Sequence, residues 1–239
     1  MGYSDNTHLI YALYVKAGLR SFYGPCIFTE LAEFPAPDPF TVDHFFQVVT
    51  GHGIVEKQIP YSSRFVHQEL PFFDEKKGEN TEEIRHTIPT PPPKFLRPGK
   101  ARGPILGGCL RKLHGLIGSP FITPSMHKGA ILFLEISQGE DGPMPLYRVR
   151  ADLVDLINTG LFDDIVGLVF GRTYMYDDQA TTELEGLLEE LVDGHGYEWP
   201  VLTGVDIGHT SPMITVPFGA QALLDSETST FGFLEEGVA

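Results

Sequence analysis

Apolar strands alternate with amphipathic helices in the second half of the chain, and this alternation constrains the fold more than any other feature. In chain order the segments are Ala130–Glu135 (strand), Leu146–Thr159 (helix), Ile165–Phe170 (strand), Glu183–Val192 (helix) and Pro200–Val205 (strand). The strands are short apolar runs, as in strands buried on both faces, and the helices repeat apolar residues at spacings of three and four. Because parallel strands need crossover helices, the pattern predicts an α/β fold.

Shorter strands replace this alternation near the C-terminus. They are expected at Met213–Pro217, Ala220–Asp225 and Thr228–Leu234, and turn residues separate them. Consecutive short strands with tight turns favour antiparallel pairing. We therefore predict a mixed α/β C-terminal domain that ends in a β-meander.

The first seven residues, Met1-Gly-Tyr-Ser-Asp-Asn-Thr7, resemble a hydrolase nucleophile turn with its helix attached. Gly2 would allow a tight turn that exposes the Ser4 hydroxyl, and a helix would run to Ala17 and end at Gly18. A short strand at Ser21–Pro25 would complete half of a βαβ unit. In the alternative interpretation, Ser4 or Asp5 only caps the helix.

Periodicity is lost from about residue 57 to residue 104, after a short helix at Thr41–Thr50 that Gly51 closes. The charged run Glu75–Glu83 and the prolines Pro91–Pro93 indicate a solvated insert and linker. The insert is either a surface loop or a lid that selects substrate. The expected organisation is a trailing part of a flavodoxin-like parallel nucleophile domain (1–56), an insert or linker (57–95) and the C-terminal domain (96–239).

Composition excludes several classes of partner. Lys plus Arg number 17 against 32 Asp plus Glu, a formal net charge of −15, which repels nucleic acid and anionic membranes. No apolar run approaches the roughly 18 residues of a membrane span, and no signal segment is evident. Cys26 and Cys109 have no metal-binding or redox spacing, and reduced thiols in a cytoplasmic protein are the simplest account.

Three residues in the order Ser4, Glu135, His209 are the parts of a hydrolytic triad. Glu135 ends a buried strand, and His209 lies in the loop Asp206-Ile-Gly-His-Thr-Ser-Pro212 after another. Taken singly, Glu135 could be a carboxylate at a domain rim and His209 a surface histidine. Taken together, they predict that His209 accepts the Ser4 proton and Glu135 orients the imidazole. A metal hydrolase using Glu135, Asp206 and His209 is the competing hypothesis, although no HExxH motif is present.

Several motifs are similar to those of the LD-carboxypeptidase family, which includes the MccF-like microcin-immunity peptidases. They are Gly2-Tyr-Ser-Asp-Asn-Thr7, Phe22-Tyr-Gly-Pro25, Gly107-Gly108, Ile131-Leu-Phe-Leu-Glu135, Gly171 and Pro200-Val-Leu-Thr-Gly-Val-Asp-Ile-Gly-His-Thr-Ser-Pro212. The resemblance implies a cytoplasmic, homodimeric serine peptidase without metal or cofactor that cleaves an amide next to a C-terminal residue. It also implies Ser4 as nucleophile, Glu135 as orienting carboxylate, His209 as base and the Asp5 N–H as an oxyanion-hole donor.

The chain departs from the family pattern in ways that affect its expected activity. Members carry an N-terminal α/β domain with a Gly-Gly loop before the nucleophile strand, so we expect this chain alone to be a poor catalyst. The family's Gly-Gly-Asn is Gly107-Gly-Cys109 here, and Ile136 replaces an acidic residue. The insert is closer in length to that of the immunity peptidases, so either a muropeptide-like or an aminoacyl-nucleotide-like substrate is expected. A noncatalytic peptide-binding relative is the alternative.

Overall fold

A computed structural model describes residues 1–33, 36–51, 59–62, 64–65 and 87–238 of the 239-residue chain. The charged run Glu75–Glu83 of the expected insert lies outside these residues. The two interpretations of the insert, surface loop or lid, therefore remain predictions.

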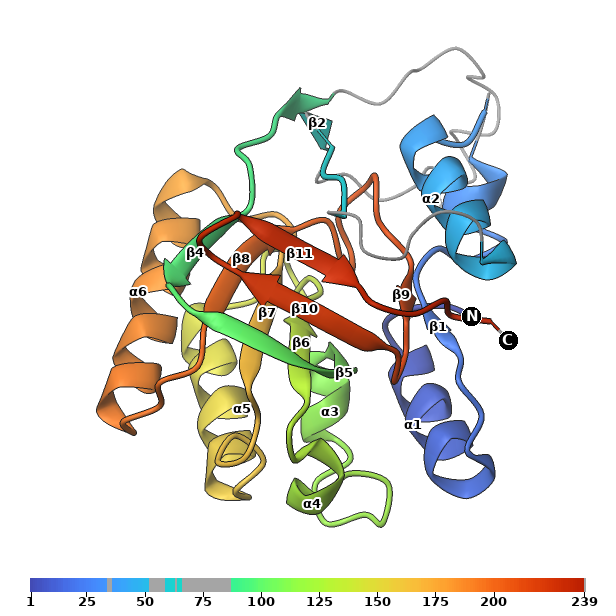
Figure 1. Cartoon of the computed structure of the whole chain (residues 1–239). Coiled ribbons are helices and arrows are strands. Elements are labelled where there is room, and N and C mark those ends of the chain that lie inside the picture. Colours follow the sequence, from blue (N-terminus) through green and yellow to red (C-terminus); the bar gives the residue numbers. More distant parts are fainter. Residues whose placement is uncertain (34–35, 52–58, 63, 66–86, 239) are drawn as a thin grey trace.

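The central element is a seven-stranded mixed sheet with the order β11-β10-β5-β6-β7-β8-β4 (Figure 1). Its strands are β4 (Lys94–Arg97), β5 (Lys100–Cys109), β6 (Ile131–Glu135), β7 (Gly167–Gly171), β8 (Val201–Val205), β10 (Gln221–Asp225) and β11 (Thr230–Phe233). Strands β5 to β8 are parallel, as the alternation of apolar strands and helices predicts. Antiparallel strands close both edges, with β4 on β8 and the β10–β11 hairpin on β5.

Several helices lie along one side of the sheet, and the N-terminal helices lie beside it (Figure 1). They are α1 (Asn6–Ala17), η1 (Glu30–Ala32), α2 (Pro39–Thr50), α3 (Leu110–His114), α4 (Pro124–His127), α5 (Leu146–Asn158) and α6 (Asp178–Gly194). Helix α1 ends where expected, because Gly18 adopts the left-handed conformation with φ 61° and its N–H caps the last turn. The parallel strands and their helices confirm the α/β fold.

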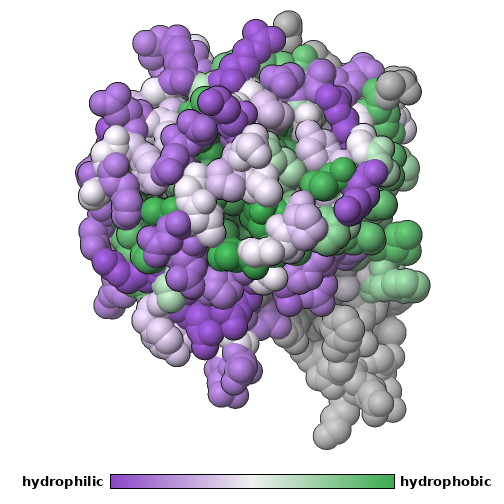
Figure 2. Space-filling model, turned by 90° about the horizontal axis from the view of Figure 1, so that it is seen from below, coloured by the Kyte–Doolittle hydropathy of each residue, from purple (hydrophilic) through white to green (hydrophobic). Residues whose placement is uncertain are grey.

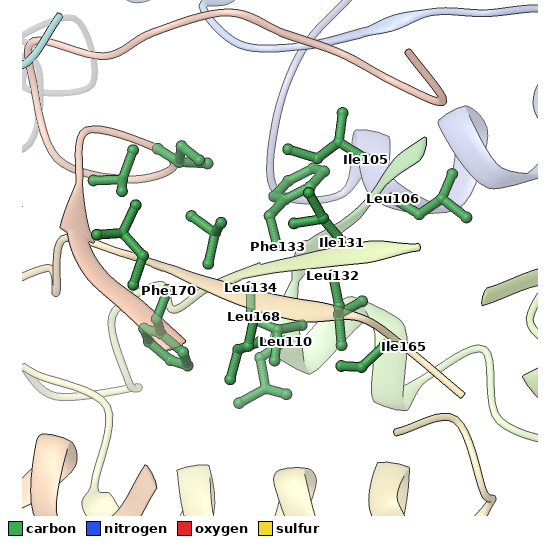
Figure 3. Packing of buried hydrophobic residues seen from close by; sticks show 14 of the residues in the cluster. Ile105, Leu106, Leu110, Ile131, Leu132, Phe133, Leu134, Ile165, Leu168 and Phe170 are labelled. Atoms are coloured by element: carbon green, nitrogen blue, oxygen red, sulfur yellow. The ribbon is translucent and has the colours of Figure 1, made fainter. Parts of the chain in front are cut away.

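One continuous hydrophobic core includes residues of the sheet and of the N-terminal helix. Buried side chains of β5, β6 and β7 interdigitate at its centre (Figure 3). Phe133 and Leu168 are fully buried there, and the same cluster includes Ile10 and Tyr11 of α1. The N-terminal helix is therefore packed on the sheet rather than separate from it.

The structure differs from the sequence expectation at two places. Strand β4 and the first half of β5 lie in the stretch, up to residue 104, for which the sequence shows no periodicity. In both segments charged residues flank few apolar ones, so the alternation of a strand is weak. Of the three C-terminal strands expected, the last two form the β10–β11 hairpin, whereas β9 (Val216–Pro217) pairs with β1 (Phe22–Tyr23). A further pair joins β2 (Arg64–Phe65) to β3 (Ile88–Pro89).

Hydrophilic side chains cover most of the face seen from below, with apolar side chains in small groups between them (Figure 2). Among the described residues, no helix combines the length and the apolar content that crossing a membrane requires. Cys26 and Cys109 are both free thiols.

Candidate active site

A cleft of about 880 Å³ opens at the carboxyl end of the parallel strands. It is bounded by the turn before α1, the start of α3, the loop between β6 and α5, and the loop after β8. Its lining includes Tyr3, Ser4, Asp5, Asn6, Arg111, Lys112, Ser137, Gln138, Glu140, Asp141, Tyr147, Arg148 and His209. In open α/β sheets this is the edge at which ligands bind.

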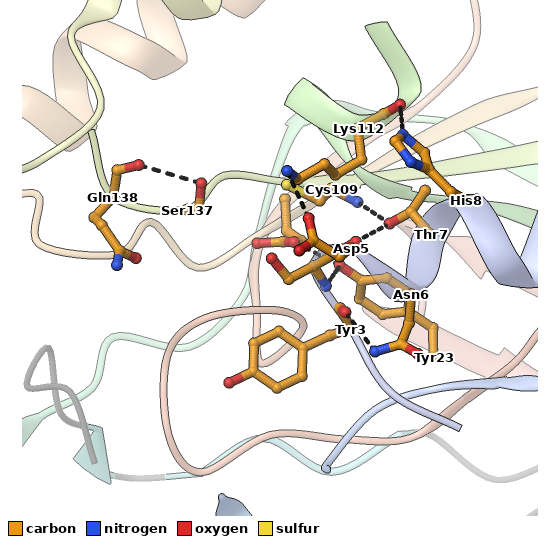
Figure 4. Close-up of polar contacts among 12 residues, drawn as sticks. Tyr3, Asp5, Asn6, Thr7, His8, Tyr23, Cys109, Lys112, Ser137 and Gln138 are labelled. Atoms are coloured by element: carbon orange, nitrogen blue, oxygen red, sulfur yellow. Dashed lines mark hydrogen bonds and ion pairs between the residues drawn. The ribbon is translucent and has the colours of Figure 1, made fainter. Parts of the chain in front are cut away.

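Ser4 adopts a backbone conformation that serine rarely uses, with φ 55°. Such strain persists only where surrounding contacts hold it, and it is frequent at functional turns. The Ser4 N–H donates to the Tyr23 hydroxyl at 3.2 Å, and its carbonyl accepts from Thr7 Oγ1 at 2.7 Å. Thr7 Oγ1 in turn accepts the Cys109 N–H at 3.2 Å, which ties the turn to the end of β5 (Figure 4). Ser4 is therefore held in a tight strand-to-helix turn, as the sequence predicts.

Glu135 and His209 are joined by a hydrogen bond. Glu135 is the last residue of β6 and is fully buried, and its Oε2 lies 2.7 Å from His209 Nδ1. Its other oxygen, Oε1, accepts from the Tyr23 hydroxyl at 2.5 Å. Because an ionised carboxylate only accepts, Nδ1 carries the imidazole proton and Nε2 is left as an acceptor. This is the tautomer that a general base needs.

The His209 ring is held from the side by an aromatic contact. The Tyr3 ring meets it edge-on at 4.9 Å between centroids, and Tyr3 donates its hydroxyl to Glu30 Oε1 at 2.9 Å. Ser4 and His209 line the same cleft, although no hydrogen bond joins the serine hydroxyl to the imidazole among the described contacts. Catalytic hydrogen bonds are often loose before substrate binds.

Asp5, the expected oxyanion-hole residue, presents its backbone N–H at the start of α1. That N–H donates to no group that the structure describes, whereas the N–H groups of Asn6 and Thr7 bond back to the turn. The Asp5 carboxylate accepts from Lys112 Nζ at 2.6 Å, and this hydrogen bond lowers its pKa. The first free N–H of the helix is thus available to a developing negative charge.

The competing metal site receives no support from the position of Asp206. Its Oδ1 accepts from Arg172 Nε at 2.8 Å and its Oδ2 accepts the Ser62 N–H at 2.6 Å. Within the described residues, no group of three His, Cys, Asp or Glu side chains could hold a metal ion. Asp206, the first residue of the His209 loop, therefore belongs to a buried ion pair with Arg172.

The sequence matches that of a known protein family. Residues 102–224 match the LD-carboxypeptidase C-terminal domain, which is more than half of the chain. The chain belongs to the LD-carboxypeptidase family. The resemblance inferred from the motifs is confirmed, and one relative is named a probable murein peptide carboxypeptidase.

Two curated LD-carboxypeptidase relatives match along nearly the whole chain. The microcin C7 self-immunity protein MccF of Escherichia coli is 28% identical over 239 residues, which cover 99% of this chain and 65% of MccF. A "Probable murein peptide carboxypeptidase" of Bacillus subtilis is 29% identical over 241 residues, which cover 100% of this chain and 63% of the relative. The chain therefore spans less than two thirds of the length of these relatives.

A solved structure of MccF shows the same architecture. It contains aspartyl sulfamoyl adenosine, is 25% identical to this chain, and superposes with a TM-score of 0.81 over 100% of this chain and 68% of its own. The mixed α/β fold is thus that of LD-carboxypeptidases.

Two residues of the cleft region were not singled out by sequence reasoning. Tyr23 lies in the family motif Phe22-Tyr-Gly-Pro25, but a tyrosine in a short strand is usually only packed, so the motif gave its position and no role. Arg148 lies on the first turn of α5, where an exposed arginine has many possible roles. Only the folded arrangement brings Tyr23 to Glu135 and Arg148 to the cleft.

Proposed function

We propose that this protein is a serine carboxypeptidase that hydrolyses the amide bond next to the C-terminal residue of a small peptide or peptide conjugate. The observation that carries the proposal is the 2.7 Å hydrogen bond from His209 Nδ1 to Glu135 Oε2 in a cleft that Ser4 also lines. A serine, an imidazole in the correct tautomer and a buried carboxylate are the groups that acyl transfer requires.

In the proposed reaction, Ser4 Oγ attacks the scissile carbonyl while His209 Nε2 accepts its proton. The N–H of Asp5 donates to the oxyanion that forms. His209 then gives the proton to the leaving amine, which departs and leaves an acyl-enzyme on Ser4. Water, deprotonated by the same imidazole, releases the acyl group and restores the hydroxyl.

The free carboxylate of the substrate needs a cationic partner in the cleft. Arg148 lines it, and its guanidinium makes no hydrogen bond or ion pair with any residue that the structure describes, so we assign the carboxylate to this guanidinium. A cleft of about 880 Å³ is in the range that small-molecule ligands occupy. MccF bound to aspartyl sulfamoyl adenosine and the murein peptide relative support either an aminoacyl-nucleotide-like or a muropeptide-like substrate.

A noncatalytic peptide-binding role is the second candidate. It is favoured by the absence of a described Ser4–His209 hydrogen bond and by Cys109, which stands where the family pattern has asparagine. In that case the cleft would bind the same peptides without covalent chemistry.

A fluorophosphonate probe separates the two candidates, because it reacts only with an activated serine. We expect mass spectrometry to find the probe on Ser4 and labelling to disappear in Ser4→Ala and in His209→Ala. Ser125→Ala, at an exposed serine of α4 outside the cleft, is the control and should label as wild type does. Absence of Ser4 labelling, with peptide binding retained, would support the noncatalytic role.

The substrate classes are compared by assaying release of the C-terminal residue from L,D-linked peptides and from aminoacyl-nucleotide conjugates. By family resemblance we further propose a cytoplasmic homodimer, which light scattering and cell fractionation test. A monomer at assay concentrations would contradict the dimer and leave the chemistry unaffected.

A further inference from the structure

One hydroxyl group contacts both the nucleophile turn and the buried carboxylate. Tyr23 donates to Glu135 Oε1 at 2.5 Å and accepts the Ser4 N–H at 3.2 Å. The second oxygen of the same carboxylate binds His209 at 2.7 Å. A continuous hydrogen-bonded path therefore runs from the Ser4 backbone through Tyr23 and Glu135 to the imidazole.

The direction of these hydrogen bonds is fixed by chemistry. A phenol has one proton, an ionised carboxylate has none, and a backbone N–H only donates. Burial raises the pKa of Tyr23 well above its ordinary value, and the negative charge of Glu135 raises it further. The phenol thus stays protonated across the working range of a peptidase and donates to Glu135 at every such pH.

The Tyr23 ring is held by packing and its backbone by strand pairing. Its side chain is 1% exposed and meets Phe133 edge-on at 5.1 Å between ring centroids. Phe133 is two residues before Glu135 on β6, so the two side chains point to the same face of the sheet. The Tyr23 backbone pairs with Val216 of β9 and bridges to Gly2, just before the nucleophile.

We propose that Tyr23 is a positioning residue that fixes the Glu135 carboxylate, and through it His209, relative to Ser4. Its hydroxyl accepts the hydrogen bond of the Ser4 N–H, so the N–H of Asp5 is left as the donor for the oxyanion. It also occupies Glu135 Oε1, so the carboxylate has one oxygen left for the imidazole and cannot rotate. The inference rests on the proposed function, because the groups positioned are those of the proposed acyl transfer.

The test compares Tyr23→Phe with Tyr11→Phe. Tyr11 is a matched control, because it is also fully buried and its hydroxyl bonds a histidine, His127, at 3.0 Å, outside the cleft. We expect Tyr23→Phe to slow fluorophosphonate labelling of Ser4 about tenfold to a hundredfold, since it removes a hydrogen bond to a charged group. Probe affinity should not change, and Tyr11→Phe should label within about twofold of wild type.

A pH profile separates positioning from loss of structure. Without the Tyr23 donor, Glu135 binds the imidazole proton more strongly, so the acidic limb of the labelling rate should move to higher pH in Tyr23→Phe and not in Tyr11→Phe. Equal rates and equal profiles in Tyr23→Phe and wild type would overturn the inference while labelling of wild type upheld the proposed function.

If wild type does not label, the proposed function fails, and the NMR signal of the His209 imidazole N–H then decides the inference. A downfield shift of this signal in Tyr23→Phe alone supports the positioning of Glu135 by Tyr23. An unchanged signal overturns it.

Discussion

Among the described residues, three Lys or Arg side chains line the cleft. Two of them are paired with carboxylates, and the third is paired with no residue that the structure describes. Arg111 bonds Asp152 at 3.1 Å and Lys112 bonds Asp5 at 2.6 Å. In each pair the carboxylate offsets the positive charge of the base, so neither Arg111 nor Lys112 has much charge left to bind an anionic ligand. Arg148 retains its five N–H donors, which match the two oxygens of a carboxylate.

The Arg148→Gln variant should therefore lose its preference for a free C-terminal carboxylate. We expect wild type to cleave a peptide acid faster than the matching C-terminal amide, and Arg148→Gln to reduce this ratio about tenfold. The measurement is kcat/KM for both substrates in both proteins.

Arg150→Gln is the control for this experiment, because Arg150 lies two residues further along α5 and pairs with Glu190 outside the cleft. Its ratio should equal that of wild type. An unchanged ratio in Arg148→Gln would show that another group binds the carboxylate.

At the scale of elements, helix α2 supports the irregular segment that follows the His209 loop. Thr41 Oγ1 accepts the Met213 N–H and His44 Nδ1 accepts the Thr215 N–H, each at 3.0 Å. Both side chains are buried, so two backbone donors that no strand satisfies are bonded by a helix instead. The helix thereby fixes the chain between His209 and β9.

Acid should weaken this contact through His44. Burial lowers the pKa of His44 from 6.5 to about 4, so the folded state keeps the imidazole neutral while the unfolded state takes up a proton. The stability that neutral His44 contributes is complete above pH 6.5 and is lost as pH falls towards about 4. The expected loss in the free energy of unfolding is of order 2 kcal/mol by about pH 5.

His44→Asn tests this prediction, because the amide oxygen can still accept the Thr215 N–H but does not titrate. Urea unfolding from about pH 8 to about pH 5 should show a shallower loss of stability in His44→Asn than in wild type. His195→Asn, at an exposed histidine, should follow wild type. Parallel curves for wild type and His44→Asn would refute the role of His44.

At the scale of the whole molecule, sequence reasoning predicted the parts whose signals are local. The buried strands β6 to β8 and the helices α5 and α6 have strong periodicity, and the position of Glu135 at a strand end follows from that pattern. Edge strand β4 was missed, because its pairing with β8 depends on a partner more than a hundred residues away. The β1–β9 pair was missed for the same reason.

The candidate site shows the same division between local and distant signals. The motifs named Ser4, Glu135 and His209 because each sits at a recognisable turn or strand end. The role of Tyr23 follows only from its distances to Ser4 and Glu135, which no spacing along the chain encodes. The proposed division into residues 1–56, 57–95 and 96–239 also stays a prediction, and it raises the question whether the first region unfolds alone.

Phe218 offers a way to answer that question, because it lies at the contact between α1 and the C-terminal strands. Its fully buried ring meets Tyr11 and Tyr14 of α1 edge-on, with centroids 5.0 and 5.2 Å away. Its N–H donates to the Ser21 carbonyl at 2.9 Å, and the N–H of Gly219 donates to Ile105 of β5 at 2.7 Å. Phe218→Ala should cost about 3–5 kcal/mol of unfolding free energy, as large cavities in cores do.

The chain's single tryptophan, Trp199, reports on the region just before β8, where it packs against Phe162 and Tyr197. Because one hydrophobic core includes both α1 and Trp199, we expect Phe218→Ala to lower the urea midpoint of Trp199 fluorescence and of helical circular dichroism by the same amount. Phe46→Ala, at a phenylalanine of α2 that is 56% exposed, should change the free energy of unfolding by no more than about 0.5 kcal/mol with either probe. If helical signal is lost first while Trp199 keeps its wild-type midpoint, the N-terminal region unfolds independently of the sheet, and the expectation of one cooperative unit is wrong.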